Sequence, residues 1–289
     1  MEAVALVACR REELRMRGFG LNSWTTGDRV SLRDDLRAAS AAGYRFVEMR
    51  DAKIEKHLEE GRSLAELRAL AEEVGVRILS VNTLEDSTYA QGARLEQLVA
   101  RCRRLAMWAE ALDCPYLIVG PSYRPESGES LPNVREHAVA ALSAYATTAA
   151  EHGRRIAFEF HGYASCTINR IDHASAILDK LGDSSVGLVI DAFHFYVGGS
   201  SLAELSALDP ARLLIVHLAD VEHADRSRLG KSNRVMPGDG VLPLGDILDA
   251  IHRTGFEGPY SLELFREEYW AMDPLRVAQL GIERMRRFA

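Results

Sequence analysis

The sequence of 289 residues predicts an α/β fold, a closed (β/α)8 barrel, from three observations. Short apolar segments alternate with amphipathic helical segments along the whole chain. Several apolar segments, such as Val186–Ile190 and Leu213–Val216, are continuous, which is typical of parallel strands buried on both faces. The chain holds eight strand–helix units, and barrels of this kind usually run to about 250 residues. We therefore expect a leader at residues 1–17 and one barrel domain at residues 18–289.

The first half of the chain supplies four units. Strands are predicted at Phe19–Ser23, Arg45–Met49, Arg77–Asn82 and Tyr116–Val119. Helices are predicted at Ser31–Ala42, Ser63–Val74, Leu95–Leu112 and Asn133–Glu151. A serine is a suitable N-cap for each of the first two helices, and a glycine after each of them favours an end there.

The second half repeats this pattern. Strands are predicted at Arg155–Phe160, Val186–Ile190, Leu213–Leu218 and Tyr260–Leu264. Helices are predicted at Ile171–Leu181, from Ser201, at Leu244–Thr254 and at Pro274–Arg287. The longest loops are expected at residues 51–62, 122–132 and 221–243. An open, doubly wound sheet is the alternative, but no Gly-x-Gly-x-x-Gly turn follows the first strand to favour it.

Composition narrows the class of protein. The chain has 35 basic and 42 acidic residues, a formal net charge of −7, so bulk charge does not favour binding to nucleic acid or an anionic membrane. No window has the length and apolarity of a membrane span. The four cysteines are scattered without a Cys-x-x-Cys pair, which indicates a reduced, cytoplasmic chain.

Four adjacent strands each place a carboxylate or an imidazole at the carboxyl end, where barrel enzymes carry their chemistry. These residues are Glu159, Asp191, His217 and Glu263. Three carboxylates buried together need a cation, and three oxygen ligands with one nitrogen ligand suit one divalent metal ion. We expect Mn²⁺, Mg²⁺, Co²⁺ or Zn²⁺ at this site.

Further side chains near the strand ends are candidates for contact with a small-molecule substrate. His194 follows Asp191 by three residues, His161 follows Glu159 by two, and Glu48 ends the second strand. Arg234 lies on the long loop after strand seven, where a guanidinium can bind a hydroxyl, carboxylate or phosphate group. A structural role is an alternative for each of these residues. Weaker candidates at the rim are Asn22, Trp24, His57, Asn82 and Tyr123.

Around these candidate residues, the sequence resembles the sugar phosphate isomerase/epimerase superfamily, the xylose-isomerase-like TIM barrels. The resemblance rests on Phe-Glu-Phe-His-Gly around Glu159, Gly-Leu-Val-Ile-Asp-Ala-Phe-His through Asp191, Val-His-Leu-Ala-Asp around His217, Arg-Val-Met-Pro-Gly-Asp-Gly from Arg234 and Ser-Leu-Glu-Leu around Glu263. It covers nearly the whole chain and is most specific from Glu159 onward. It implies the barrel, a single-metal site, a sugar-like substrate and, by analogy, a homo-oligomer.

The resemblance also implies an activity. As in the ketose 3-epimerases, Glu159 and Glu263 would be both metal ligands and the acid/base pair, on opposite faces of a keto-sugar, sugar phosphate or related polyol. The implied reaction is isomerisation or epimerisation through a metal-stabilised enediolate.

Three alternatives remain within the resemblance. Dehydratases of the inosose or 3-dehydroshikimate type share the barrel, and the Glu159-x-His161 pair resembles theirs. Apurinic endonucleases need extra histidines that are missing from the ends of strands three and four, which here read Asn82-Thr-Leu-Glu and Gly120-Pro-Ser-Tyr. A barrel that only binds a metabolite would be expected to lack some of the four ligands.

Overall fold

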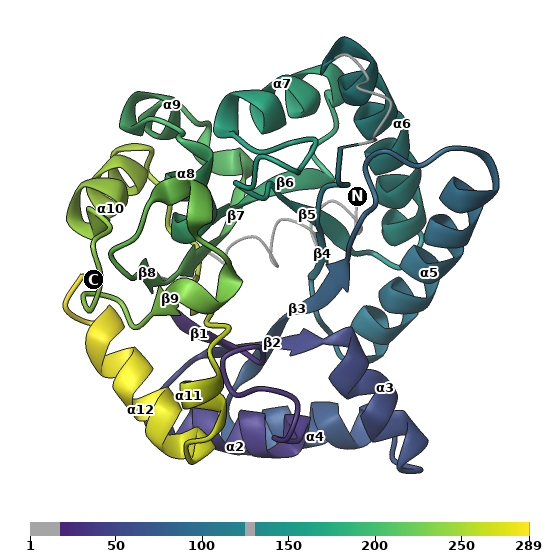
Figure 1. Cartoon of the computed structure of the whole chain (residues 1–289). Helices are drawn as coiled ribbons and strands as arrows, with labels where there is room; N and C mark the ends of the chain where they lie inside the picture. The colour runs from purple at the N-terminus through teal and green to yellow at the C-terminus, as the bar shows by residue number, and fades with distance from the viewer. Residues whose placement is uncertain (1–17, 125–130, 289) are drawn as a thin grey trace.

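A computed structural model describes residues 18–124 and 131–288 of the chain. Eight parallel strands close into a barrel in the order β1-β10-β7-β6-β5-β4-β3-β2, so the predicted fold class is confirmed (Figure 1). The barrel strands are β1 (Phe19–Asn22), β2 (Phe46–Arg50), β3 (Arg77–Leu84), β4 (Tyr116–Val119), β5 (Arg155–Glu159), β6 (Val186–Asp191), β7 (Leu213–Leu218) and β10 (Tyr260–Leu262). The predicted leader at residues 1–17 lies outside the described residues.

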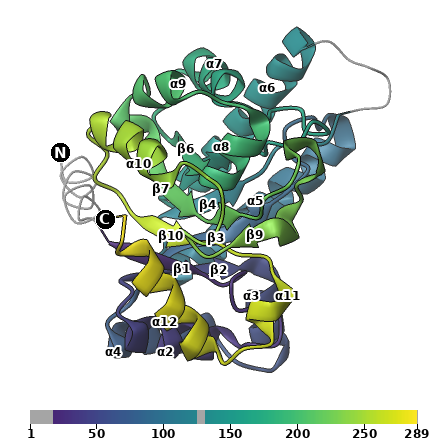
Figure 2. The ribbon, with the colours of Figure 1, turned by 60° about the vertical axis from the view of Figure 1, so that its left-hand side comes forward.

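Helices surround the barrel on the outside (Figure 2). Those that follow the strands in the predicted alternation are α2 (Leu32–Ala42), α4 (Leu64–Val74), α5 (Gly92–Ala111), α6 (Leu131–Ala150), α7 (Ile171–Leu181), α9 (Leu202–Ser206), α10 (Leu244–Arg253) and α12 (Pro274–Met285). The predicted caps of α2 and α4 are confirmed, because Ser31 and Ser63 accept hydrogen bonds from the first-turn N–H groups of Asp34 and Glu66.

Several short helices and strands lie in segments that were predicted as loops or for which no helix or strand was predicted. These are α3 (Asp51–Glu59), α8 (Ala192–Gly198), α11 (Glu267–Trp270), and the antiparallel pair β8 (Asp220–Val221) and β9 (Arg234–Val235). Helices α3 and α11 begin without a side-chain cap, so they carry no N-terminal sequence signal. No helix in the described part of the chain is long and apolar enough to cross a membrane.

The inside of the barrel is filled by one small apolar cluster. Its members are Phe46, Leu79, Tyr116, Ile118, Ala157, Val189, Leu214 and Ile215. Alternate residues of a strand face the same side of the sheet. Glu159, Asp191 and His217 therefore face inward two residues after Ala157, Val189 and Ile215, and they lie directly on this apolar floor. The larger apolar cluster contains most of the buried helix residues.

Candidate metal centre

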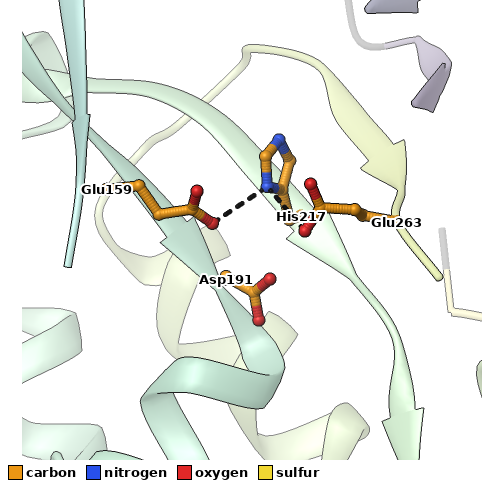
Figure 3. Close-up of side chains that lie close together, drawn as sticks. All are labelled: Glu159, Asp191, His217 and Glu263. Carbon is orange, nitrogen blue, oxygen red and sulfur yellow. Dashed lines mark hydrogen bonds and ion pairs between the residues drawn. The ribbon is translucent and has the colours of Figure 1, made fainter. Parts of the chain in front are cut away.

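Four side chains from four neighbouring strands meet above the apolar floor of the barrel. Glu159 and Asp191 end β5 and β6, His217 lies in β7, and Glu263 directly follows β10. One possible ligand atom from each of Glu159, Asp191, His217 and Glu263 lies within 4.8 Å of the others, and all four residues are buried. Figure 3 shows Glu159 and Glu263 on either side of His217, with Asp191 close to all three.

The imidazole of His217 is the centre of the cluster. Its Nδ1 lies 3.1 Å from Glu159 Oε1 and 3.5 Å from Glu263 Oε2. Its Nε2, on the other side of the ring, lies 3.1 Å from Glu48 Oε1. Burial alone would lower the pKa of His217, but the carboxylates of Glu48, Glu263 and Glu159 raise it well above its usual value. In the absence of a metal, the ring therefore serves as a counter-ion to these carboxylates.

Arg234 supplies a second buried cation. Its Nη1 donates to Asp191 Oδ2 and to Glu263 Oε2, both at 2.7 Å. Its guanidinium carbon lies 4.5 Å from the ring centroid of Phe193 and 4.8 Å from that of Phe265. Although burial disfavours its charge, the two carboxylates raise the pKa of Arg234, so the group stays cationic.

The loop that carries Arg234 is fixed by Asp220. The carboxylate of Asp220 accepts N–H groups from Gly238 at 3.1 Å, Gly240 at 3.0 Å and Leu242 at 2.8 Å. A Cβ atom on Gly240 would lie 2.2 Å from the carbonyl oxygen of Val221, so only glycine fits there. The Met-Pro-Gly-Asp-Gly motif is therefore a tight turn that holds β9 against β8.

The carboxylates respond differently to their surroundings. Burial raises the pKa of Asp191 to about 6, although Arg234 opposes the shift. Burial also acts to raise the pKa of Glu159 and of Glu263, but the net shift of both is downward, because His217 acts on both carboxylates together with His161 on Glu159 and Arg234 on Glu263.

Three buried carboxylates and one imidazole nitrogen match the donor set that a single divalent cation prefers. The four side chains thus form a cluster suited to one divalent metal ion, and their role as its ligands stays a prediction.

Two histidines flank this centre. His194 lies in α8, and its Nδ1 accepts the N–H of Gly162 at 3.1 Å, while its Nε2 lies 3.2 Å from Nη2 of Arg234. The ring of His161 stacks on that of His194 with a centroid distance of 4.6 Å, and its Nε2 lies 3.7 Å from Glu159 Oε2. The structure thus brings His161, His194 and Arg234 together with the four proposed ligands; their contact with a substrate stays a prediction.

Other residues named from the sequence have different positions. Glu48 is fully buried, and its carboxylate faces His217 and accepts a hydrogen bond from Ser80 at 2.7 Å. Asn22 donates to Glu263 Oε1 at 2.9 Å. His57 instead contacts the carbonyl group of Ser63 on the outer side of the barrel, and the side chain of Tyr123 is exposed.

Phe265 and Ser80 also line this centre and were not predicted from the sequence. Phe265 packs against both Arg234 and the ring of Trp24, at a centroid distance of 4.8 Å from the latter. Phe265 could have been predicted from its position two residues after Glu263, because alternate side chains of an extended segment point to the same side. Ser80 lies in the middle of β3, and the residues around it in the sequence do not indicate that Glu48 lies beside it.

The family of the chain follows from this fold and from comparison with known proteins. A family model described as the xylose isomerase-like TIM barrel matches residues 36–288. The chain belongs to this family, which confirms the resemblance drawn from its motifs.

Particular relatives give a narrower comparison. The chain is 29% identical to an inosose isomerase of Halalkalibacterium halodurans over 252 residues, which cover 87% of this chain and 89% of the relative. It is 24% identical to a 3-dehydroshikimate dehydratase of Pseudomonas aeruginosa over 245 residues, 83% of this chain but 37% of that longer protein. A crystal structure of the IOLI protein with a bound zinc atom superposes with a TM-score of 0.89 at 26% identity, over 94% of this chain and 97% of that one. These named relatives include both an isomerase and a dehydratase.

Proposed function

We propose that this protein is a divalent-metal-dependent isomerase of a cyclic keto-polyol of the inosose class. The observation that carries the proposal is the placement of Glu159 and Glu263 on either side of His217, with Nδ1 3.1 Å from the first carboxylate and 3.5 Å from the second. Two carboxylates that face one another across a metal centre can exchange protons with opposite faces of one substrate. The inosose isomerase relative, similar over nearly the full length of both chains, supports the substrate class.

Glu159, Asp191, His217 and Glu263 would hold the ion. When bound, a divalent ion supplies a Lewis acid that polarises a carbonyl or hydroxyl oxygen of the substrate. The buried guanidinium of Arg234 and the ring of His194 lie beside the carboxylates, where they can bind further hydroxyl groups.

The protein groups then move protons without any net gain or loss of atoms. One glutamate removes the proton from the carbon next to the carbonyl group. A proton is returned to the former carbonyl carbon, and a hydroxyl proton moves between the two neighbouring oxygens. Both carboxylate oxygens of Glu263 accept hydrogen bonds, from Asn22 and from Arg234. Glu159 Oε2, in contrast, has its nearest cationic neighbour in His161, whose Nε2 lies 3.7 Å away. We therefore assign the first proton removal to Glu159.

The test is hydrogen exchange in D₂O, followed by proton NMR of an inosose incubated with the metal-loaded protein. Wild type should exchange the proton beside the carbonyl group and yield a second inosose. Glu159→Gln and Glu263→Gln should fold and bind the substrate, but lose about 10²- to 10⁴-fold in turnover. Full activity of both variants would overturn the assignment of the acid/base pair.

A dehydratase is the second candidate, and His161 favours it. Its Nε2, 3.7 Å from Glu159 Oε2, is placed to protonate a hydroxyl group that leaves from the carbon beyond the one that loses a proton. The 3-dehydroshikimate dehydratase relative supports this reading as well. A dehydratase would form a conjugated enone that absorbs in the ultraviolet, and His161→Gln would remove that product while proton exchange continues. An inosose product without such absorbance supports the isomerase.

A further inference from the structure

Glu48 is a fully buried carboxylate that none of the proposed proton transfers uses. It lies in β2, on the far side of His217 from the other carboxylates, with its Oε1 3.1 Å from Nε2 of the ring. We propose that Glu48 is a positioning residue of the metal centre, which keeps the His217 proton on Nε2 and directs the Nδ1 lone pair at the metal. This inference rests on the proposed function, because it assumes that the cluster holds a metal ion.

The assignment follows from the two nitrogens of His217. A neutral imidazole carries one proton, and only the unprotonated nitrogen can bind a metal. Nδ1 is the nitrogen next to Glu159 Oε1 and Glu263 Oε2, at 3.1 and 3.5 Å. For Nδ1 to be a ligand, the proton must lie on Nε2, and an N–H group buried at this depth needs an acceptor. Glu48 supplies it, with oxygens 3.1 and 3.3 Å from Nε2.

Glu48 is itself held in place by neighbouring polar side chains. Ser80 donates its hydroxyl to Glu48 Oε2 at 2.7 Å, and Nδ2 of Asn22 lies 3.4 Å from Glu48 Oε1. Asn22 also donates to Glu263 at 2.9 Å, so the same group contacts a proposed ligand and Glu48. Asn22, Glu48 and Ser80 are all fully buried. The carboxylate therefore has a fixed orientation, and a shift of Glu48 would disturb His217 directly and Glu263 through Asn22.

The negative charge of Glu48 has a second effect. A metal ion draws electron density from the imidazole, and a carboxylate bonded to the opposite N–H makes the ring a stronger donor. Replacement of such partners typically weakens metal binding by about 10- to 100-fold. Of the side chains that hydrogen-bond to Glu48 in the described part of the chain, His217 is the one that can carry a positive charge. The pair is therefore suited to stabilise a metal-bound imidazole.

The test is calorimetric titration of the chelator-treated full chain with Co²⁺. Wild type should bind one ion, and Glu48→Ala should bind it about 10- to 100-fold more weakly. Glu48→Gln keeps an oxygen that can accept a hydrogen bond from Nε2. Its affinity for Co²⁺ should therefore lie between that of wild type and that of Glu48→Ala. Ser80→Ala removes a hydrogen bond that holds Glu48 but leaves the carboxylate and its contact with His217, so this variant should lose less affinity than Glu48→Ala.

The outcomes separate this inference from the proposed function. If wild type binds Co²⁺ and Glu48→Ala binds it equally well, the positioning role is overturned while the metal centre stands. If wild type binds no metal, the proposed function and this inference both fail. A second measurement needs no variant, namely ¹⁵N NMR of His217 in the zinc-loaded wild type. The proton should be found on Nε2 with zinc on Nδ1, and zinc on Nε2 would overturn the proposal even if Glu48→Ala did not fold.

Discussion

Arg234 donates through Nη1 to Glu263 Oε2 at 2.7 Å, within the same cluster whose four side chains are suited to a metal ion. The same nitrogen also lies 2.7 Å from Asp191. The guanidinium therefore offsets the charge of two proposed ligands before a metal binds. Arg234 should therefore contribute more to the stability of the metal-free protein than to the stability of the metal-loaded protein.

Replacement of Arg234 by Met should destabilise the metal-free protein by about 3–5 kcal/mol, because it leaves buried carboxylates without their partner. With Mn²⁺ bound, the loss should be smaller, since the ion supplies positive charge to the same oxygens. The free energy of unfolding, measured in urea with and without Mn²⁺, gives both values. Arg234→Lys, which keeps the charge but not the fork of donors, is the control. Equal losses in the two states would contradict this account.

Hydrogen bonds and charge set the protonation of His161. Burial would lower the pKa of this ring, but Cys166 and Glu159 raise it to about 10. The ring should therefore stay protonated between pH 7 and 9 in the metal-free protein, which ¹³C NMR of the imidazole can follow. Because an unfolded histidine titrates near pH 6.5, its contribution to folding stability is fully present below about pH 6.5 and is lost as the pH rises through about 10.

Glu159→Gln is the control for that titration. It keeps the size of the side chain but removes the carboxylate that lies 3.7 Å from His161 Nε2, so the pKa of His161 should fall. If the pKa of His161 were near its ordinary value in wild type and unchanged in the variant, the assigned interaction would be wrong.

Asp220 should control the order of the loop that carries Arg234. Asp220→Ala removes the acceptor of the N–H groups of Gly238, Gly240 and Leu242, each loss costing about 1–3 kcal/mol locally. We expect faster amide exchange over residues 238–242 and lower turnover, with metal binding largely kept. Asp220→Asn, which retains one acceptor oxygen, should show a smaller change. Unaltered exchange at these amides in Asp220→Ala would refute the role of Asp220.

Much of this arrangement could be predicted from the sequence. The strands are apolar runs with clear ends, and the carboxyl ends of parallel strands meet at one edge, so Glu159, Asp191, His217 and Glu263 could be grouped without a structure. The contact between Glu48 and His217 could not be predicted, because it crosses the barrel from β2 to β7 and depends on how the closed strands are staggered. Arg234 was placed on the correct loop, but its burial between Phe193 and Phe265 depends on the turn that Asp220 fixes.

The central claim is that Glu159, Asp191, His217 and Glu263 hold one divalent metal ion, and elemental analysis of the purified protein tests it most directly. The comparison is between wild type and the double variant Glu159→Ala and His217→Ala, each checked for folding by circular dichroism. We predict about one equivalent of Mn, Co, Mg or Zn in wild type and none in the folded double variant. About three equivalents of zinc would instead indicate a cluster of the endonuclease type. A wild type that holds no metal, even after incubation with Mn²⁺, would contradict the account.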